Sequence, residues 1–428
     1  MEKLSIKQAY LYLKSYAYHD NLNLFLKERI AQFELNDFDD GLVLIESVLS
    51  EDNILETDTF KDWLNHISYH VLPKSVIRPE DKIQNEHNKQ NGLFLSNVRS
   101  SNNYEIQKVN YFIDAPIHIH ILETLWSLVV GPILEEDLTK DCYGNRLHDF
   151  AYKFSDNTDK SSPKNSVEIF KRYIDQYNDW RDNAIKKASY LADQNEDIAL
   201  LSLDLKSYFY HIEIDFNKIN DLIILKLFGD IQTFALKLNA ILEATFEKYL
   251  DTIKPRLKSS HQECINKSGI PIGFASSSIL ANWYLAEFDS AVSQTVRPAY
   301  YGRYVDDILL VMKRPKVDTE HPIEILISNY FSDLIQKDSK SGEYIIPVAD
   351  NFLPIQPEKL ILQYFDKNHS RAGLEVFKQE LDEQSSAFKF LPEEHIDGDL
   401  DKFAYDVLYD GSANKLRSIV GLAENSTE

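Results

Sequence analysis

Two adjacent aspartates stand in the stretch with the clearest chemical potential. Asp306 and Asp307 follow aromatic residues and a glycine and precede an apolar, β-branched run, within residues 300–312. This pattern predicts two short strands with both aspartates at the tight turn between them. Two carboxylates at the tip of an apolar hairpin are costly to bury unless cations compensate them, and divalent metals are the usual compensation. An isolated Asp-Asp pair is more often a solvated turn, so a metal site requires a third carboxylate from another strand.

A third carboxylate follows a buried-strand pattern earlier in the chain. Residues 199–205 are apolar on both faces of an expected strand except for Ser202 and Asp204. An aspartate in a strand that is buried on both faces is costly, so its presence indicates a function. Residues 269–278, Gly-Ile-Pro-Ile-Gly-Phe-Ala-Ser-Ser-Ser, are expected to open a helix that runs to about residue 292. The two glycines allow close backbone approach to a ligand, and the serines are expected to cap the helix.

Length, net charge and cysteine content limit which classes of protein this chain can belong to. A chain of 428 residues suggests two or three subdomains, and its net charge of −22 argues against a non-specific nucleic-acid coat, although a local basic channel is compatible with it. Cys142 and Cys264 lie far apart and lack metal-ligand spacing, which favours a reducing compartment. The N-terminus has no hydrophobic signal core, and no apolar run reaches membrane-spanning length. We therefore expect a cytoplasmic protein without a membrane partner.

Apolar periodicity predicts the elements around these motifs. Within residues 1–75 it predicts four helices, at 6–17, at 22–33, from Asp39 or Asp40 onward, and from Asp58 to Pro73. A β-hairpin is expected from residues 93–98 and 104–113. Further helices are expected at 117–131, 170–191, 216–228 and 231–253, the last of them ending before Pro255.

The three signals occur in one order along the chain, and this order resembles the palm of reverse transcriptases. Asp204 through Phe209 resembles the first palm motif, Gly269 through Ser278 the second, and Tyr304-Val305-Asp306-Asp307 the third. Other segments extend the resemblance over about residues 93–391: the fingers motif at Tyr143-Gly144-Asn145-Arg146, the segment 352–359 that ends in a palm lysine, and, more weakly, a primer-grip strand at 388–391.

The resemblance implies an α+β fold with the fingers and palm of a right-hand polymerase, an N-terminal helical extension, and a short or absent thumb. The implied divisions are the helical extension at residues 1–75, fingers at 76–198, a palm at 199–391 with a helical insertion at about 216–265, and a short C-terminal segment at 392–428 that is either a vestigial thumb or a linker to a missing region.

The resemblance also implies site residues for an RNA-directed DNA polymerase, a nucleotidyltransferase. Asp204 and Asp306 would hold two Mg²⁺ ions, for which Mn²⁺ can substitute, with Asp307 supporting them. The implied metal site also includes Leu205. The implied nucleotide-binding residues are Arg146, which would hold the triphosphate, Leu205, Phe209 and Gly273.

Two of these residues carry more specific expectations. Phe209 occupies the position of the aromatic that blocks a ribose 2′-hydroxyl in this family, which implies deoxynucleotide substrates. Lys359 either protonates the leaving pyrophosphate or closes a surface ion pair with Glu358.

Ile272 replaces the glutamine that many reverse transcriptases have in the second palm motif. The pattern is closer to the abortive-infection and defence-associated bacterial branch, some members of which add nucleotides without a template or prime from a protein side chain. The implied function is DNA synthesis from a 3′-hydroxyl or protein primer in antiphage defence in the bacterial cytoplasm. The implied partners are dNTPs, an RNA template or non-coding RNA, a DNA product, and a partner protein or a second copy of the chain. The alternatives are template-independent, protein-primed synthesis and a non-catalytic palm that serves as a nucleic-acid-binding or assembly module.

Overall fold

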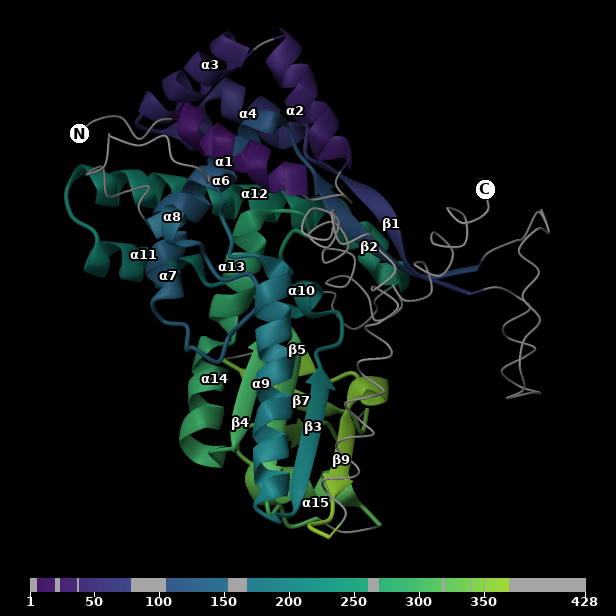
Figure 1. Cartoon of the computed structure of the whole chain (residues 1–428). Helices are drawn as coiled ribbons and strands as arrows, with labels where there is room; N and C mark the ends of the chain where they lie inside the picture. Colours follow the sequence, from purple (N-terminus) through teal and green to yellow (C-terminus); the bar gives the residue numbers. More distant parts are fainter. Residues whose placement is uncertain are drawn as a thin grey trace, which may run out of the picture.

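The computed structural model describes residues 6–19, 24–36, 38–77, 105–152, 168–260, 269–317, 320–339, 341–349 and 351–368. The strand expected at 93–98, the primer-grip strand at 388–391 and the C-terminal segment lie outside these ranges. Figure 1 shows a helical layer from the N-terminus at the top, a second group of helices below it, and a sheet at the bottom. No helix in the described ranges is both long enough and apolar enough to cross a membrane.

The N-terminal layer consists of α1 (Ile6–His19), α2 (Leu24–Asn36), α3 (Phe38–Ser50), η1 (Ile54–Glu56) and α4 (Asp58–Asn65). The first three predicted helices are confirmed, but the fourth ends at Asn65, and residues up to Pro73 belong to β1 (Ser68–Ile77). The expected extension of this helix is therefore wrong. Pro73 is tolerated because β1 is one of only two strands in its sheet and shifts register between Pro73 and Ser75.

The second strand of the expected hairpin is present as β2 (Glu105–Asp114). It pairs antiparallel with β1, from Ser68 opposite Asp114 to Ile77 opposite Glu105. The partner of β2 is thus β1, whose residues up to Pro73 the sequence pattern assigned to a helix.

The middle layer is helical and surrounds the second palm motif. Its elements are α6 (Ile117–Val129), α7 (Gly131–Glu135), α8 (Asp149–Tyr152), α11 (Phe216–Lys226), α12 (Asp230–Ser260) and α13 (Ala275–Tyr284). Helix α12 continues through Pro255 instead of ending before it. Proline has no N–H to donate, but Ile253 and Leu257 on either side of it are buried, so packing favours continuation of the helix.

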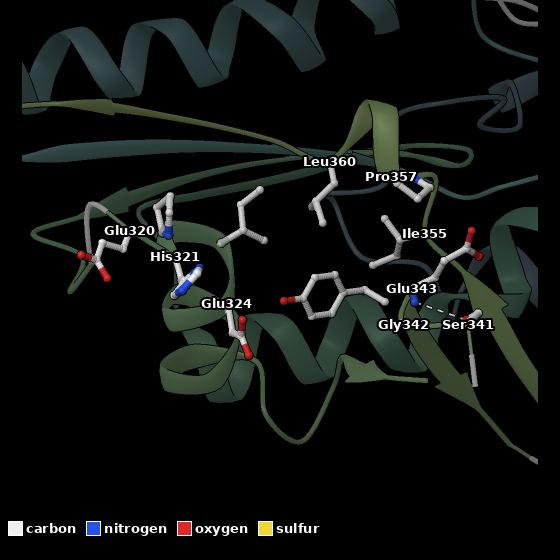
Figure 2. Close-up of a pocket in the computed structure, with 12 residues that line it drawn as sticks. Glu320, His321, Glu324, Ser341, Gly342, Glu343, Ile355, Pro357 and Leu360 are labelled. Atoms are coloured by element: carbon white, nitrogen blue, oxygen red, sulfur yellow. Dashed lines mark hydrogen bonds between the residues drawn. The ribbon is translucent and has the colours of Figure 1, made fainter. Parts of the chain in front are cut away.

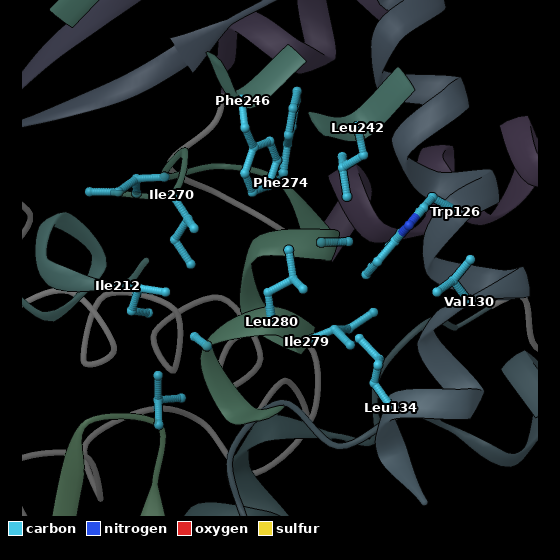
Figure 3. Close-up of a cluster of buried hydrophobic side chains, with 14 of the residues drawn as sticks. Trp126, Val130, Leu134, Ile212, Leu242, Phe246, Ile270, Phe274, Ile279 and Leu280 are labelled. Atoms are coloured by element: carbon cyan, nitrogen blue, oxygen red, sulfur yellow. The ribbon is translucent and has the colours of Figure 1, made fainter. Parts of the chain in front are cut away.

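A shared apolar core joins these helices. Figure 3 shows Trp126 from α6, Phe246 from α12, and Phe274 and Leu280 at and after the start of α13 converging on one cluster. The exposed fraction of Trp126 and Leu280 is 0%. Helix α13 is therefore held by neighbours from distant parts of the sequence.

The lower sheet has the strand order β4-β5-β3-β9, and all its pairs are antiparallel. Its strands are β3 (Ile198–Asp204), β4 (Tyr300–Tyr304), β5 (Asp307–Lys313) and β9 (Ile361–Phe365). Helix α9 (Tyr173–Asp193) covers one face, as Figure 1 shows, with Ala184 and Ala188 packed against Leu200 and Val311. The predicted strand with Asp204 and the predicted hairpin are both confirmed.

The remaining elements connect or cover this sheet. They are α10 (Tyr208–His211), α14 (Ala286–Ala291), the π-helical η2 (Val292–Val296), α15 (Pro322–Tyr330), β6 (Gln336–Lys337), β7 (Tyr344–Val348), β8 (Asn351–Pro354) and η3 (Pro357–Lys359). The helix expected over 275–292 is present as two helices that meet at Leu285. The mixture of helices and sheets agrees with the predicted α+β class, while the boundaries of fingers and palm stay predictions.

Candidate active site

Three aspartates gather at one end of the lower sheet. Asp204 is the last residue of β3 and lies directly opposite Asp307, the first residue of β5. The Leu205 N–H donates a hydrogen bond of 3.3 Å to the carbonyl of Asp306, which ties the hairpin turn to the end of β3. The antiparallel register therefore brings together carboxylates that are about a hundred residues apart in the sequence.

The negative charges at this end of the sheet lie close enough together to shift the pKa of a carboxyl group. Burial, followed by the charges of Asp306 and Asp204, raises the pKa of Asp307 well above its ordinary value. Lys359, in η3, places its Nζ 2.6 Å from Oδ2 of Asp204. Burial alone would lower the pKa of Lys359, but the Asp204 carboxylate and its hydrogen bond outweigh this and raise it. Lys359 thus pairs with Asp204 and not with Glu358; its role as a proton donor stays a prediction.

The chemistry of the aspartates fits a divalent cation. Carboxylate oxygens are the ligands that Mg²⁺ takes in proteins, and a cation would relieve the repulsion that raises the pKa of Asp307. Within the described ranges, however, no group of three or more His, Cys, Asp or Glu side chains is arranged to hold a metal ion. Asp204 would exchange the Lys359 ammonium for the cation, so the assignment of Asp204, Asp306, Asp307 and Leu205 as metal site stays a prediction.

Phe209 is held by its neighbours on both sides. Tyr208 and Tyr210 are buried; the Tyr208 hydroxyl donates to the carbonyl of Ala281 at 2.6 Å, and the Tyr210 hydroxyl accepts from the Tyr111 N–H at 2.8 Å. Phe209 itself is only half-buried. These contacts fix the backbone of α10, while the Phe209 side chain stays partly exposed.

The second palm motif packs against both α10 and β2. The Ile270 N–H donates to the carbonyl of Phe209 at 2.8 Å, and the Ile113 N–H donates to the carbonyl of Ile272 at 2.9 Å. Gly273 adopts φ +114°, a backbone conformation that favours glycine. The loop that carries Gly273 is therefore fixed against the segment that presents Phe209.

The expected serine cap of α13 is wrong. The N-cap residue is Phe274, which makes no side-chain capping bond, and the carboxylate of Glu123 in α6 accepts the Ser276 N–H at 3.0 Å. A buried glutamate from a distant helix thus takes the place of the local serines, because Ser276 and Ser277 are themselves packed into the core.

Glu123 makes protein stability depend on pH. Burial raises its pKa from 4.5 to about 7, although the Ser276 and Ala275 N–H groups partly offset this. Because the folded state keeps a proton that the unfolded chain releases, the contribution to the free energy of unfolding is present at low pH and is lost as the pH rises through about 7. Glu123→Gln is expected to flatten this dependence between pH 4.5 and about 7. Urea denaturation of both proteins across this range checks it; parallel profiles would contradict the assignment.

Comparison with known families bears on the same residues. Residues 135–332 match the family model described as reverse transcriptase (RNA-dependent DNA polymerase). This part of the chain is thus similar to a reverse transcriptase domain. Its enzyme class is that of an RNA-directed DNA polymerase, a nucleotidyltransferase, and polymerases of this family generally use divalent metal ions. A comparison with curated proteins gives no match.

The matched range begins at Glu135, the last residue of α7, and this residue holds Arg146. The Arg146 Nε donates to the carboxylate of Glu135, and its Nη1 donates to the carbonyls of Thr139 at 2.9 Å and Cys142 at 2.6 Å. Burial raises the pKa of Glu135, although attraction to Arg146 partly offsets this. In this arrangement Arg146 closes the loop between α7 and the Tyr143-Gly144 turn. To hold a triphosphate it would exchange some of these partners, so that role stays a prediction.

A pocket lies beside η3, and its lining comes both from residues 320–324 inside the matched range and from residues 341–360 beyond it. It has a volume of about 450 Å³ and is lined partly by Pro357 of η3 and by Leu360 directly after η3, both labelled in Figure 2, and by Tyr344. None of the three aspartates lines it. The candidate chemistry of the three aspartates therefore lies outside this pocket.

Sequence reasoning missed a buried charged group beside the turn that carries Asp306 and Asp307. Arg303 in β4 and Asp289 in α14 form an ion pair of 2.7 Å, and neither side chain has exposed surface. The available signal was an arginine among the aromatic residues of the first strand expected in the hairpin, because a buried arginine there requires a partner. The sequence did not reveal that partner because Asp289 lies in a different element.

Proposed function

We propose that this chain is a DNA polymerase of the reverse transcriptase type, which adds deoxynucleotides to a 3′-hydroxyl or to a protein primer with Asp204, Asp306 and Asp307 as holders of two divalent ions. The observation that carries the proposal is the register of β3 and β5, which places Asp204 opposite Asp307 with Asp306 beside it. The match of residues 135–332 to reverse transcriptases supports the same chemistry.

Divalent ions held at this site would neutralise the triphosphate and lower the pKa of the attacking hydroxyl. The chain itself supplies the geometry. Asp204 comes from a central strand whose backbone is paired on both sides, so its carboxylate has a fixed position. Lys359 stays protonated at neutral pH because its pKa is raised. The proposal assigns it the transfer of a proton to the departing pyrophosphate, and its position beside Asp204 supports this role.

Nucleotide incorporation by the purified chain tests this function. The protein with Mg²⁺ or Mn²⁺ and labelled dNTPs is expected to make DNA, both with each nucleotide alone and with the mixture. Pretreatment of the protein with RNase separates two forms of the proposal. Loss of product indicates a copurified RNA template or primer, whereas product that survives and stays attached to denatured protein indicates untemplated or protein-primed synthesis. No incorporation under any of these conditions would contradict the proposal.

We further propose that the synthesis serves antiphage defence in bacteria, as the resemblance to the defence-associated branch implies. The support is Ile272, whose side chain is buried while its carbonyl is bonded to Ile113. An apolar side chain in the core cannot take the hydrogen-bonding role of glutamine. Phage challenge of cells that express the wild-type chain or an Asp306→Ala, Asp307→Ala variant tests the role; equal protection by both would contradict a role for DNA synthesis.

Phe209 is expected to select the sugar of the incoming nucleotide. Its backbone is fixed by the Ile270 N–H while its ring is half-exposed, so Phe209→Ala should open space without moving the neighbouring strands. Removal of the ring is expected to raise the ratio of ribonucleotide to deoxynucleotide incorporation by about 10- to 200-fold, the usual range for steric discrimination in a pocket. Competition between the two nucleotides measures this ratio. Tyr190→Ala, an exposed aromatic on α9, is the control and should leave the ratio unchanged.

A further inference from the structure

Arg303 is a completely buried cation whose hydrogen-bonding capacity is fully used. Its Nε and Nη2 donate to the carboxylate of Asp289, its Nη2 also donates to the carbonyl of Asn282 at 2.9 Å, and its Nη1 donates to Oδ1 of Asn282 at 3.2 Å and to the carbonyl of Val305 at 2.9 Å. A guanidinium has five N–H groups, and each of them has an acceptor here. Such complete satisfaction fixes the position of every group that the guanidinium touches.

One of these acceptors belongs to the turn that presents the aspartates. Val305 lies between β4 and Asp306 and has φ +57°, a left-handed conformation that is a genuine outlier for a β-branched residue. Such a conformation persists only where the surroundings over-determine it. The bond from Arg303 Nη1 to the Val305 carbonyl supplies that constraint directly, one residue before Asp306.

The same cluster connects the turn to the loop that carries the fingers motif. The side-chain amide of Asn282 donates to the carbonyl of Gly144. The Tyr143 N–H donates to the Arg303 carbonyl at 2.8 Å, and the Arg303 N–H donates to the Asp141 carbonyl at 2.8 Å. The loop at residues 141–144, helix α13 and the catalytic hairpin therefore meet at one arginine.

We propose that Arg303 is a positioning residue for the polymerase reaction: through the Val305 carbonyl it holds the strained turn in the conformation that aims Asp306 and Asp307 toward Asp204. This inference rests on the proposed function of the three aspartates. Asp289 neutralises the guanidinium and sets its orientation, and Asn282 transmits the same constraint to the loop at Gly144. Arg303 acts through the backbone and is not expected to touch the nucleotide.

Arg303→Lys is the informative variant. Lysine keeps the positive charge beside Asp289, but its single ammonium lacks the fork that reaches Asp289, Asn282 and Val305 at once. Tyr301→Phe is the matched control, because the Tyr301 hydroxyl donates to Oδ1 of Asp289 at 2.5 Å within the same cluster but does not contact the turn. The control therefore disturbs the buried network while it leaves the Arg303–Val305 bond in place.

Two readouts separate positioning from stability. In steady-state incorporation, Arg303→Lys is expected to lower kcat by about 10²-fold and to raise the Mg²⁺ concentration for half-maximal rate, with the KM for dNTP nearly unchanged. Tyr301→Phe is expected to keep kcat within about twofold of wild type, even where its melting temperature falls as far as that of Arg303→Lys. Equal losses of kcat in the two variants at matched melting temperatures would overturn the inference.

Hydrogen exchange of the peptide that spans Val305 to Asp307 measures how readily the turn opens, and it needs no polymerase reaction. Exchange of these amides is expected to be faster in Arg303→Lys than in wild type and unchanged in Tyr301→Phe. Faster exchange in Arg303→Lys alone would support the inference even where the wild-type chain incorporated no nucleotide. That lack of incorporation would count against the proposed function and not against the role of Arg303 in holding the turn. Unchanged exchange in an active protein would overturn the inference alone. If Arg303→Lys does not fold, Asn282→Ala, which keeps the Asp289 pair, carries the same test with a smaller expected increase in exchange.

Discussion

Replacement of Asp306 and Asp307 together by alanine is expected to reduce nucleotide incorporation by at least about 10³-fold. The two carboxylates are partly buried and lie beside and opposite Asp204. Loss of bound divalent ions removes several kcal/mol of charge stabilisation in the transition state, and each 1.36 kcal/mol corresponds to about a factor of ten in rate. The measurement is incorporation of labelled dNTP at saturating Mg²⁺ and again with Mn²⁺.

The same variant is not expected to lose stability. Burial and the charges of Asp306 and Asp204 raise the pKa of Asp307, so the negative charge of this carboxylate costs free energy in the metal-free fold. Removal of that charge should leave the melting temperature of the metal-free protein equal or higher. Addition of Mg²⁺ should stabilise the wild type more than the variant, since only the wild type keeps the ligands.

Asp333→Ala is the matched control, because Asp333 is an exposed aspartate outside the site. It is expected to change incorporation by less than about twofold, as surface substitutions usually do. Product formation by the Asp306→Ala, Asp307→Ala protein at the wild-type rate would refute the assignment of these carboxylates. A variant that was inactive only because it failed to fold would be recognised by its melting curve.

Gly144→Ala is expected to lower incorporation by about 10²-fold although Gly144 is in the fingers loop and not in the hairpin. A Cβ atom at this position would lie 2.8 Å from Cγ2 of Val305, 3.0 Å from the backbone nitrogen of Val305 and 3.1 Å from the ring of Tyr304. The backbone atom cannot move without the hairpin, so the turn that carries Asp306 must shift. A misplacement of about 1 Å in a catalytic group costs a factor of this size.

Gly229→Ala provides the contrasting control. Gly229 has φ +65°, so alanine there is strained, but a Cβ atom would meet nothing within 4 Å. It should therefore cost about 1 kcal/mol of stability without an effect on the rate per folded molecule. Rate and melting temperature measured on both variants separate the two effects; a Gly144→Ala protein with the wild-type rate would show that the close packing of loop and hairpin is not needed.

The sequence determined the strand that ends in Asp204 and the hairpin that carries Asp306 and Asp307. Continuous apolar runs of strand length interrupted by carboxylates are unusual enough to be read directly, and the structure confirms both elements. Most of the helices followed from apolar periodicity in the same way, whereas the α+β class was implied by the resemblance to reverse transcriptases. A local pattern is sufficient for these features because each is specified by neighbouring residues.

Local patterns failed where distant segments changed the outcome. Pro73 was expected to stop a helix but is tolerated in β1 because β2 pairs with that strand. Pro255 did not end α12 because residues on both sides of it are buried by other elements. The serines that were expected to cap α13 were replaced by Glu123, whose carboxylate arrives from a helix about 150 residues earlier.

Only the tertiary structure decided how the site is held together. The sequence allowed Lys359 to pair with Glu358 next to it, and the fold places it on Asp204 instead. It contained Arg303 without any indication that Asp289 would neutralise it or that Val305 would accept its hydrogen bond. These contacts join residues from different elements, and a periodic pattern along the chain does not predict which buried charges will come into contact.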